Sequence, residues 1–408
     1  MADTVVDVAI VGAGPVGASL ALGLADLGLK TVVIDGRSAD SSPKNDGRNF
    51  AIVTGSCRLL DTLGIAGKLT GNSQPLHGLE AVDGGGHILP APSVMFQDSD
   101  LDSPDPDDTL GQMVRAEDLQ RALDDALALE ENLTVLRPCR FKGVETDNGY
   151  STLYLDGADT IRTRLLIGAD GMNSPVRKAL GITVEGRDYG KSVFTANVKL
   201  DRPHQGIARQ LFLPEGPFAT LPLTGDRANL AWYLKRGAAE ALADCTQAEI
   251  EAELNAKFAS FSGPMTLDSP AGSYPLILQV ATQIIATRAA LVGDAARRVN
   301  PLAGQGLNQG FRDAAALIDV LKEAQAVGLD IGSPSVLEGF SEARRFEGTA
   351  AALALDGIDR LFSNDLALTK PIRSLGLLAA NEIGPLRRWL ARKASATDDG
   401  VPASMEAW

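Results

Sequence analysis

The chain opens with a hydrophobic run followed by a glycine-rich turn. Residues 5–17 read Val5-Val6-Asp7-Val8-Ala9-Ile10-Val11-Gly12-Ala13-Gly14-Pro15-Val16-Gly17. The run suits a strand that is buried on both faces, as in a parallel sheet. A helix from Ala18 to Leu27 and a second strand from Lys30 to Asp35 complete a βαβ unit. The sequence therefore predicts an α/β fold built on a Rossmann-like domain.

The glycine spacing of this turn is typical of a nucleotide-binding fingerprint. Gly12 permits the tight turn, Gly14 lets the backbone approach a pyrophosphate, and Gly17 lets the helix pack close to the sheet. The free N–H groups of the helix then face the phosphates. Asp35 ends the second strand, where its carboxylate accepts hydrogen bonds from a ribose. Alone, this unit fits NAD, FAD or an ordinary βαβ turn.

Two further signatures follow predicted strands later in the chain. The strand Thr160–Ile167 runs into Gly168-Ala169-Asp170-Gly171, and the strand Ala289–Val292 runs into Gly293-Asp294-Ala295-Ala296. Ligands of open α/β sheets bind outside the carboxyl ends of the strands. An extended dinucleotide needs contacts from several separated strand ends, so the three signatures together predict FAD.

Individual residues of the later signatures have distinct expected roles. Asp170 either faces the ligand or caps the helix that follows it, and Asp294 accepts hydrogen bonds from a polyol. Gly304 and Gly306 precede a helix that extends to Ala324. The positive end of that helix would face the pyrimidine edge of a flavin and stabilise negative charge on the reduced ring.

The middle of the chain differs from its ends in the secondary structure that its sequence predicts. Short strands and turns from Lys191 to Tyr274 indicate an inserted antiparallel β-sheet domain for the substrate. The expected boundaries are 1–74, 112–186 and 283–365 for the FAD-binding domain. The substrate domain takes 75–111, with an acidic loop between Asp98 and Asp108, and 187–282. Residues 366–408 form a C-terminal helical tail.

Composition excludes several classes of protein and of site. The chain has 408 residues, 45% of them hydrophobic, and a net charge of -14, which argues against nucleic acid as a partner. Its 3 cysteines fit neither a disulfide framework nor a zinc cluster. The acidic run from Asp98 lacks the glycine and glutamate of a calcium loop, so no metal site is predicted. Without a signal peptide or an apolar span, a cytoplasmic location is expected.

The C-terminal tail reverses the charge of the chain. Between Lys370 and Lys393 six basic residues stand against Glu382 alone, whereas the whole chain carries -14. This reversal indicates contact with a membrane surface, with a polyprenyl lipid headgroup region or with an acidic partner. The alternative is a helix pair packed on its own domain with solvated basic residues. The oligomeric state stays open, a homo-oligomer included.

The motifs together resemble a known family over nearly the whole chain. They are Gly12–Gly17, Asp46-Gly47-Arg48, Arg115, Gly168–Arg177, Gly293–Ala296 and Asn300-Pro301-Leu302-Ala303-Gly304-Gln305-Gly306-Leu307-Asn308. This set resembles the class A FAD-dependent aromatic hydroxylases of the p-hydroxybenzoate hydroxylase superfamily. The Asn300–Asn308 string and the tail from Gly384 to Leu390 resemble the ubiquinone-biosynthesis hydroxylase branch (UbiH, UbiF and VisC type).

The resemblance implies roles for particular residues. Asp35 would bind the adenosine ribose, Arg48 and Arg115 would be flavin-side arginines, and Asp294 would contact the ribityl chain. Asp170 belongs to a motif associated with both FAD and NAD(P)H. The turn that faces the flavin would comprise the residues Pro301, Gly304, Gly306 and Leu307.

The resemblance also implies an activity. NAD(P)H would reduce FAD, O2 would form a flavin C4a-hydroperoxide, and one oxygen atom would pass to the aromatic ring of a polyprenylated ubiquinone precursor. The alternatives are a hydroxylase of a small soluble phenolic acid and a flavin-binding accessory subunit of a quinone-biosynthesis complex. With the resemblance, the basic C-terminal segment is expected to contact such a complex or to make the protein peripheral to the inner membrane. The family often has a histidine where this chain has Arg297, interpreted here as a solvated or phosphate-neutralising arginine. No catalytic acid or base is therefore assigned.

Overall fold

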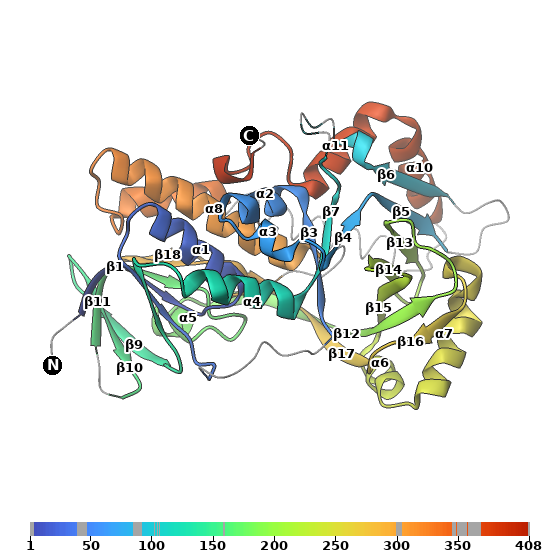
Figure 1. The fold of residues 1–408 in the computed structure, drawn as a ribbon, viewed down its shortest axis with the longest axis horizontal. Helices are drawn as coiled ribbons and strands as arrows, with labels where there is room; N and C mark the ends of the chain where they lie inside the picture. The colour runs from blue at the N-terminus through green and yellow to red at the C-terminus, as the bar shows by residue number, and fades with distance from the viewer. Residues whose placement is uncertain are drawn as a thin grey trace.

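Two large β-sheets at opposite ends of the long axis organise the molecule (Figure 1). The computed structural model describes residues 4–38, 47–84, 92–101, 103, 105, 107–157, 160–298, 304–344, 348, 357 and 369–406. The α/β fold class with a Rossmann-like domain is confirmed. The domain boundaries expected from the sequence remain a prediction.

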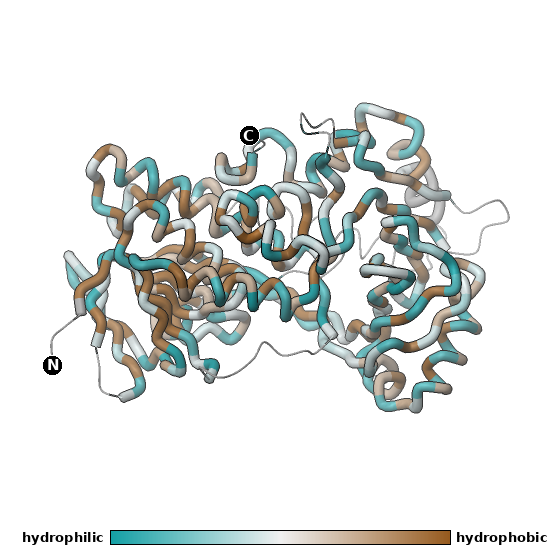
Figure 2. Tube along the Cα trace, viewed as in Figure 1, coloured by the Kyte–Doolittle hydropathy of each residue, from teal (hydrophilic) through white to brown (hydrophobic). Residues whose placement is uncertain are grey.

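The first sheet contains the predicted βαβ unit. Its strands are, in order, β18 (Ile285–Ala286), β19 (Ala289–Leu291), β11 (Thr160–Gly168), β1 (Thr4–Val11), β2 (Thr31–Ile34) and β8 (Leu133–Leu136), with β10 (Ser151–Leu155) and β9 (Phe141–Thr146) added beside β11. β1 pairs in parallel with both β11 and β2, which explains its hydrophobic run. The most hydrophobic stretches gather around β1 and β11 (Figure 2).

Helices cover this first sheet and carry the predicted signatures. They are α1 (Pro15–Asp26), α4 (Ala116–Leu127), α5 (Pro175–Ala179) and α8 (Gln305–Ala326). α1 packs against both α4 and α8. Leu20, Leu24, Phe311 and Leu317 are fully buried in the shared core. The hydrophobic faces of α1 and α8 therefore hold the starts of both helices at one side of the sheet.

The second sheet has nine strands and is antiparallel except where β13 meets β5. Its strands are β20 (Arg297–Arg298), β17 (Gly272–Ala281), β12 (Val184–Leu200), β15 (Arg227–Lys235), β14 (Phe218–Leu223), β13 (Ile207–Phe212), β5 (Gly78–Asp83) and β6 (Ser93–Gln97), and β16 (Met265–Leu267) pairs with β12. The helices α6 (Arg236–Ala243) and α7 (Gln247–Ser262) pack against it. Phe218 of the sheet stacks on Phe258 of α7 with ring centroids 3.6 Å apart.

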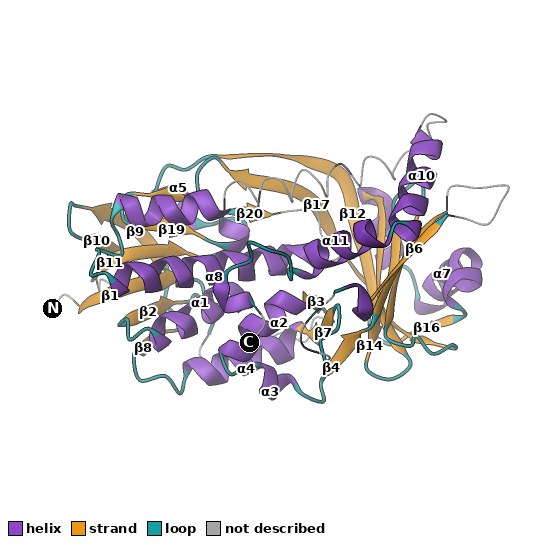
Figure 3. Cartoon of the chain, turned by 90° about the horizontal axis from the view of Figure 1, so that it is seen from above, coloured by secondary structure: helices purple, strands orange, loops and turns teal. Residues whose placement is uncertain are grey.

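The strands β12 and β17 run from one sheet toward the other (Figure 3). β12 has 17 residues, although the sequence predicts a strand only from Ser192. Residues 184–191 are largely exposed and charged, so they lack the alternation of hydrophobic residues that marks a half-buried strand. Pairing with β17 makes this stretch a strand, and that pairing is a long-range contact.

A small sheet lies between the two large ones. It consists of β3 (Asn49–Val53), β7 (Gly111–Arg115) and β4 (Ser73–Leu76), followed or flanked by the helices α2 (Thr54–Thr62) and α3 (Ala66–Leu69). Asn49 lies opposite Arg115 in the antiparallel register of β3 and β7. The expected flavin-side arginines, Arg48 and Arg115, are therefore neighbours at one end of this sheet.

The C-terminal helices α10 (Thr369–Glu382) and α11 (Gly384–Ser395) pack on each other and against β6. Arg387 donates to the buried Asp100 of the short helix η1 (Asp98–Asp100) at 2.9 Å, so the first part of the acidic loop is anchored. Arg392 pairs with Asp399, and Lys393 pairs with Asp398. Acidic groups of the same chain thus neutralise part of the basic tail. Among the described residues, no helix combines the length and hydrophobicity needed to cross a membrane.

Candidate functional site

The first two signatures touch through their backbones. Gly12 follows β1 with a φ of +105°, and a Cβ built on it would lie 2.3 Å from the carbonyl oxygen of Ala169. A Cβ on Gly17 would lie 2.1 Å from the carbonyl oxygen of Gly12. No side chain fits at either position. The close approach of β1, β11 and α1 therefore requires these two glycines.

The third signature meets the first through α8. A Cβ on Gly310 of α8 would lie 2.5 Å from Cγ2 of Val16, and the backbone of Gly293 is the next contact, at 3.3 Å. Gly293 begins the short helix η2 (Gly293–Ala295), which carries Asp294. Three segments that are far apart in the sequence thus converge beside the start of α1.

Two glycines of the convergence point face open space instead of protein. Among the described residues, a Cβ on Gly14, directly before α1, would meet no atom within 4 Å, and the same holds for Gly306 in the first turn of α8. Protein packing does not require a glycine at either position. Space in front of two helix N-termini fits anionic or electron-rich parts of a ligand, such as the pyrophosphate of FAD.

Asp35 lies at the end of β2 in a cluster of arginines. It accepts hydrogen bonds from Arg37 N at 2.9 Å and Arg37 Nε at 2.8 Å, and Arg137 Nη2 donates to it at 3.0 Å. Burial alone would raise the pKa of Asp35, but these hydrogen bonds and charges lower it below its ordinary value. The carboxylate therefore stays ionised as an acceptor at the strand end. Arg137 lies 102 residues from Asp35 in the chain, so no pattern near Asp35 predicts this contact.

Asp170 accepts a hydrogen bond at the start of the helix that follows it and keeps one carboxylate oxygen without a partner among the described residues. Its Oδ2 accepts from Val176 N at 2.9 Å at the start of α5, where Ser174 is the N-cap and accepts from Arg177 N. Its Oδ1 is buried and has no hydrogen-bond partner within the described part of the chain. Burial raises the pKa of Asp170, and the bonds from Ser174 and Val176 oppose the rise. A buried oxygen without a partner is costly unless a ligand supplies a donor.

The acid of the third signature is more exposed than Asp35 and Asp170. Asp294 has a solvent-exposed side chain. Desolvation by the surrounding protein nevertheless raises its pKa, with the charge of Arg298 opposing the rise. Because the side chain is exposed, a ligand can reach it. Gly304 is the N-cap of α8 with a φ of +66°, and Leu307 packs against the core. Pro301 lies outside the described residues.

Asn308 connects β3 to the start of α8. Its Oδ1 accepts from Val53 N at 3.0 Å, and its Nδ2 donates to Ala51 O at 2.8 Å and to Gly304 O at 3.0 Å. The side chain is 1% exposed. Asn308 ends the Asn300–Asn308 string that resembles the family, and no role is expected for it from the sequence. Its position one helical turn after Gly304 was the only available signal.

We expect Asn308→Leu to destabilise this junction. The change removes three hydrogen bonds and leaves buried backbone groups of β3 without partners, at a cost of about 2–5 kcal/mol. Thermal unfolding and the FAD content of the purified protein measure the effect. Asn308→Asp keeps the oxygen that accepts from Val53 N but loses the amide that donates to Ala51 O and Gly304 O. Its unfolding temperature should therefore lie between those of the wild type and Asn308→Leu. An unfolding temperature of Asn308→Leu equal to that of the wild type would contradict the assignment.

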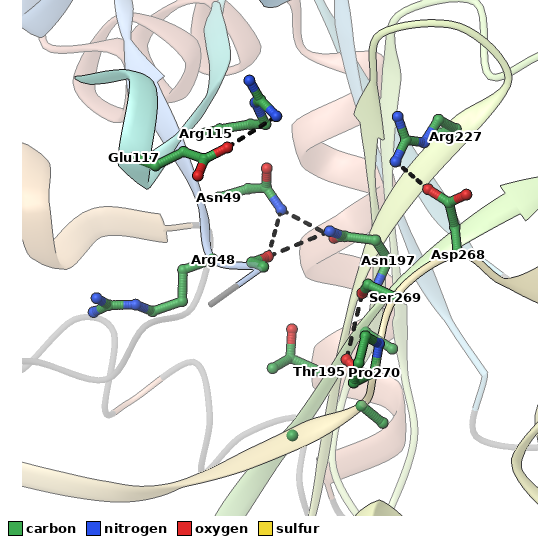
Figure 4. Close-up of a pocket in the computed structure, with 14 residues that line it drawn as sticks. Arg48, Asn49, Arg115, Glu117, Thr195, Asn197, Arg227, Asp268, Ser269 and Pro270 are labelled. Atoms are coloured by element: carbon green, nitrogen blue, oxygen red, sulfur yellow. Dashed lines mark hydrogen bonds and ion pairs between the residues drawn. The ribbon is translucent and has the colours of Figure 1, made fainter. Parts of the chain in front are cut away.

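The two arginines expected on the flavin side, Arg48 and Arg115, differ in their surroundings. Arg115 donates to Asp118 through Nε at 2.6 Å and pairs with Glu117 at 2.9 Å, and these acids raise its pKa. The side chain of Arg48 is exposed and points away from Asn49 and Asn197 (Figure 4). Both arginines line a pocket of about 480 Å³ between the small sheet and the nine-stranded sheet.

The interpretation of Arg297 as a solvated or phosphate-neutralising arginine is wrong. Its side chain is 2% exposed, and its Nη1 lies 2.6 Å from Asp313 Oδ1. Arg344 Nε approaches the same oxygen at 2.8 Å, and Gly293 N donates to Asp313 Oδ2 at 3.0 Å. Arg297 therefore belongs to a buried cluster that holds η2. The partners lie 16 and 47 residues away, so the local sequence could not reveal them.

Comparisons with known proteins agree with this geometry. A family model described as an FAD binding domain matches residues 5–351. The chain is 38% identical over 399 residues to the ubiquinone hydroxylase UbiL of Rhodospirillum rubrum, covering 97% of this chain and 91% of the relative. It is 36% identical over 388 residues to the 3-demethoxyubiquinol 3-hydroxylase of Escherichia coli, covering 94% and 96%.

A solved structure shows the same fold. The p-nitrophenol 4-monooxygenase PnpA of Pseudomonas putida superposes with a TM-score of 0.79 at 20% identity, covering 97% of this chain and 99% of that one. The converging signatures, the family match and the two relatives lead to one conclusion. The chain belongs to the family of FAD-dependent aromatic hydroxylases that includes the ubiquinone hydroxylases.

Proposed function

We propose that this protein uses FAD and NAD(P)H to hydroxylate the aromatic ring of a polyprenylated ubiquinone precursor. The observation that carries the proposal is the convergence of the three signatures beside the start of α1. The hydroxylase relatives, similar over nearly their whole length, support the substrate class.

The residues of the chain would divide the binding of FAD, which when bound supplies hydride acceptance and oxygen activation. Gly14 leaves room for the pyrophosphate at the start of α1. Asp35 would bind the adenosine ribose, and Asp294 would bind the ribityl chain. Asp170 would use its unpartnered Oδ1 to accept a hydrogen bond from the cofactor or from the reductant. The N-terminus of α8 would stabilise negative charge on the ring.

A hydrophobic cluster beside the start of α8 supports a lipophilic substrate. Ala51 and Met113 of the small sheet are buried in it. A Cβ on Gly304 would lie 3.0 Å from Cβ of Ala51, so the cluster adjoins the flavin-facing turn. The side chains packed against it from the nine-stranded sheet are Leu79, Phe96, Leu221 and Leu223. This surrounding is apolar and favours a polyprenylated ring over a small phenolic acid.

Quinone profiling of a strain that lacks the gene tests this function. We expect a polyprenylated intermediate without one ring hydroxyl to accumulate, and reintroduction of the gene should remove it. A normal quinone profile together with turnover of a small phenolic acid by the purified enzyme would favour the alternative hydroxylase. Purified protein that binds FAD but is not reduced by NADH or NADPH, with or without a phenol, would favour the accessory subunit.

We further propose that the α10–α11 pair contacts the membrane surface. It exposes the large hydrophobic residues Leu378, Ile383 and Trp389, with the exposed Arg388 and Lys393 nearby on α11. Hydrophobic side chains beside basic ones suit the interface of an anionic bilayer. Since Asp398, Asp399 and Asp100 neutralise part of the basic charge, the hydrophobic contacts must supply much of the affinity.

Vesicle sedimentation with Trp389→Glu tests this contact. We expect the change to weaken binding of the full chain to anionic vesicles by roughly tenfold or more, because it removes hydrophobic burial and adds a repelled charge. Leu329→Glu is the matched control, since Leu329 is 50% exposed and Trp389 is 56% exposed. Equal binding of the wild type and both variants would contradict a membrane contact.

A further inference from the structure

The pocket beside Arg48 and Arg115 is polar, unlike the hydrophobic cluster next to it. It is lined on one side by the segment Gly47–Asn49 and Arg115, and on the other by Asn197, Arg227 and the segment Asp268–Gly272. Apolar side chains come only from Ala196, Pro270 and Ala271 among its described lining residues. Its volume of about 480 Å³ lies within the range of small-molecule sites. A polar ligand fits this pocket better than a polyprenyl chain.

A network of amides fixes the rim of the pocket. Asn49 Nδ2 donates to Gly47 O at 2.9 Å and to Asn197 Oδ1 at 3.0 Å (Figure 4). Asn229 Nδ2 donates to the same oxygen of Asn197 at 2.9 Å. Asn197 and Asn229 face each other across β12 and β15. The side chains therefore join the small sheet to the nine-stranded sheet. A preformed rim of this kind reduces the entropic cost of binding a ligand.

The charge of the pocket favours an anionic ligand. Arg48, Arg115 and Arg227 line it together with Glu117 and Asp268, so the lining has one more basic than acidic side chain, while the whole chain carries -14. Arg115 pairs with Glu117 and Arg227 pairs with Asp268, so the net charge of the lining is +1. An acidic protein that keeps a local excess of arginine in one pocket attracts an anion there.

The pocket adjoins the expected FAD site without overlapping its glycines. Arg48 and Arg115 belong to both, but none of the residues of the three glycine-rich signatures lines the pocket. Asn49 stands two residues before Ala51, which is packed beside Gly304. A ligand in the pocket would therefore approach the flavin from the side of the nine-stranded sheet.

The reaction requires a second anionic ligand at the flavin. The sequence contains one Gly-x-Gly-x-x-Gly fingerprint, at Gly12–Gly17, and FAD occupies it in the proposed function. A pyridine nucleotide must then bind without a Rossmann unit of its own. We infer that the pocket between β3, β7, β12 and β15 binds the nicotinamide nucleotide half of the reductant, with Arg227 facing its phosphate. This inference rests on the proposed function, because it supplies the site for NAD(P)H.

Gly272 allows the pocket to be blocked without disturbing the fold. It lines the pocket at the start of β17, and a Cβ built on it meets no atom within 4 Å. Gly272→Leu therefore places a side chain in the pocket. Gly143 of β9 is the matched control, because it also lies in a strand and its Cβ also meets nothing within 4 Å. Arg227→Met, at an exposed position, is a second variant that leaves the pocket open and removes the positive charge together with its ion pair to Asp268.

The experiment measures steady-state oxidation of NADH and NADPH by the FAD-loaded full chain, and follows flavin reduction by stopped-flow absorbance. We expect Gly272→Leu to raise the KM for NADH and NADPH by roughly tenfold or more, and Arg227→Met to raise it to a smaller extent. The absorption spectrum of bound FAD and its reduction by dithionite should not change, and Gly143→Leu should behave as the wild type. These two readouts would change if the substitution only damaged the FAD site.

Three outcomes would overturn the inference. One is an unchanged KM for the reductant in both Gly272→Leu and Arg227→Met. Another is loss of FAD from Gly272→Leu, which would assign the pocket to the cofactor itself. The third is a raised KM for the phenol alone, which would assign it to the substrate. Wild-type protein that neither NADH nor NADPH reduces would instead refute the proposed function, and the inference with it.

Discussion

Gly17→Ala is expected to destabilise the apoprotein and to abolish FAD binding. The new Cβ would lie 2.1 Å from the carbonyl oxygen of Gly12 and 3.0 Å from Cβ of Ala169, and both belong to the closely packed strand ends. α1 must move away from the sheet, at a cost of about 1–3 kcal/mol or more. The move also displaces the N–H groups that would face the phosphates. Thermal unfolding of the apoprotein and fluorescence titration with FAD measure the two effects.

Gly14→Ala separates ligand binding from packing. Its Cβ would meet no protein atom within 4 Å, and the φ of -68° at Gly14 is open to alanine. We expect the apoprotein to unfold at the wild-type temperature, while the affinity for FAD falls because the methyl group occupies the space of the approaching ligand. FAD affinity equal to that of the wild type would show that the pyrophosphate does not lie at Gly14. Normal stability of Gly17→Ala would refute the packing argument.

The second large effect is expected at Asp313. It is fully buried, and it lies 2.6 Å from Arg297, 2.8 Å from Arg344 and 3.0 Å from the amide of Gly293. Asp313→Leu leaves two buried guanidinium groups without this partner, and such a loss costs about 3–5 kcal/mol. It also frees η2, so the affinity for FAD should fall with the stability. Denaturant unfolding and FAD titration measure the two losses.

Two variants make the Asp313 prediction specific. Asp313→Asn keeps an acceptor for the amide of Gly293 but removes the negative charge. It should therefore lose about as much stability as Asp313→Leu but bind FAD more tightly than that variant. Glu253→Gln breaks an exposed pair with Lys257 in α7 and should leave unfolding unchanged. If Asp313→Leu unfolds like Glu253→Gln, the buried cluster does not stabilise the protein.

The sequence was sufficient to predict the features that depend on local patterns. The hydrophobic run of β1, the glycine spacing of the first turn and the strands before Asp170 and Asp294 were all readable, because parallel strands are continuously hydrophobic and end at one edge. These features led to the α/β fold and to the convergence of the signatures. The roles of the individual site residues remain predictions.

Features that depend on distant partners could not be read from the sequence. The polarity of Arg297 suggested exposure, because an arginine is rarely buried unless it is paired. Its partner Asp313 lies 16 residues further along the chain, in α8. Nothing in either local segment links the two residues. At the rim of the pocket, likewise, Asn49 donates a hydrogen bond to Asn197, which lies 148 residues away in the chain. A single sequence predicts which groups are polar, but the fold decides which of them meet.

The contact between Gly12 and Ala169 limits how this chain can vary or be rebuilt. The carbonyl of Ala169 occupies the space that any side chain at position 12 would need. A dinucleotide-binding fingerprint is often treated as a segment that can be transferred between proteins. Here, a graft of residues 5–35 into another scaffold would need a host strand that ends as closely beside the first turn as β11 does. Recombination breakpoints between the first and second signatures should therefore be tolerated only when both parents share this spacing.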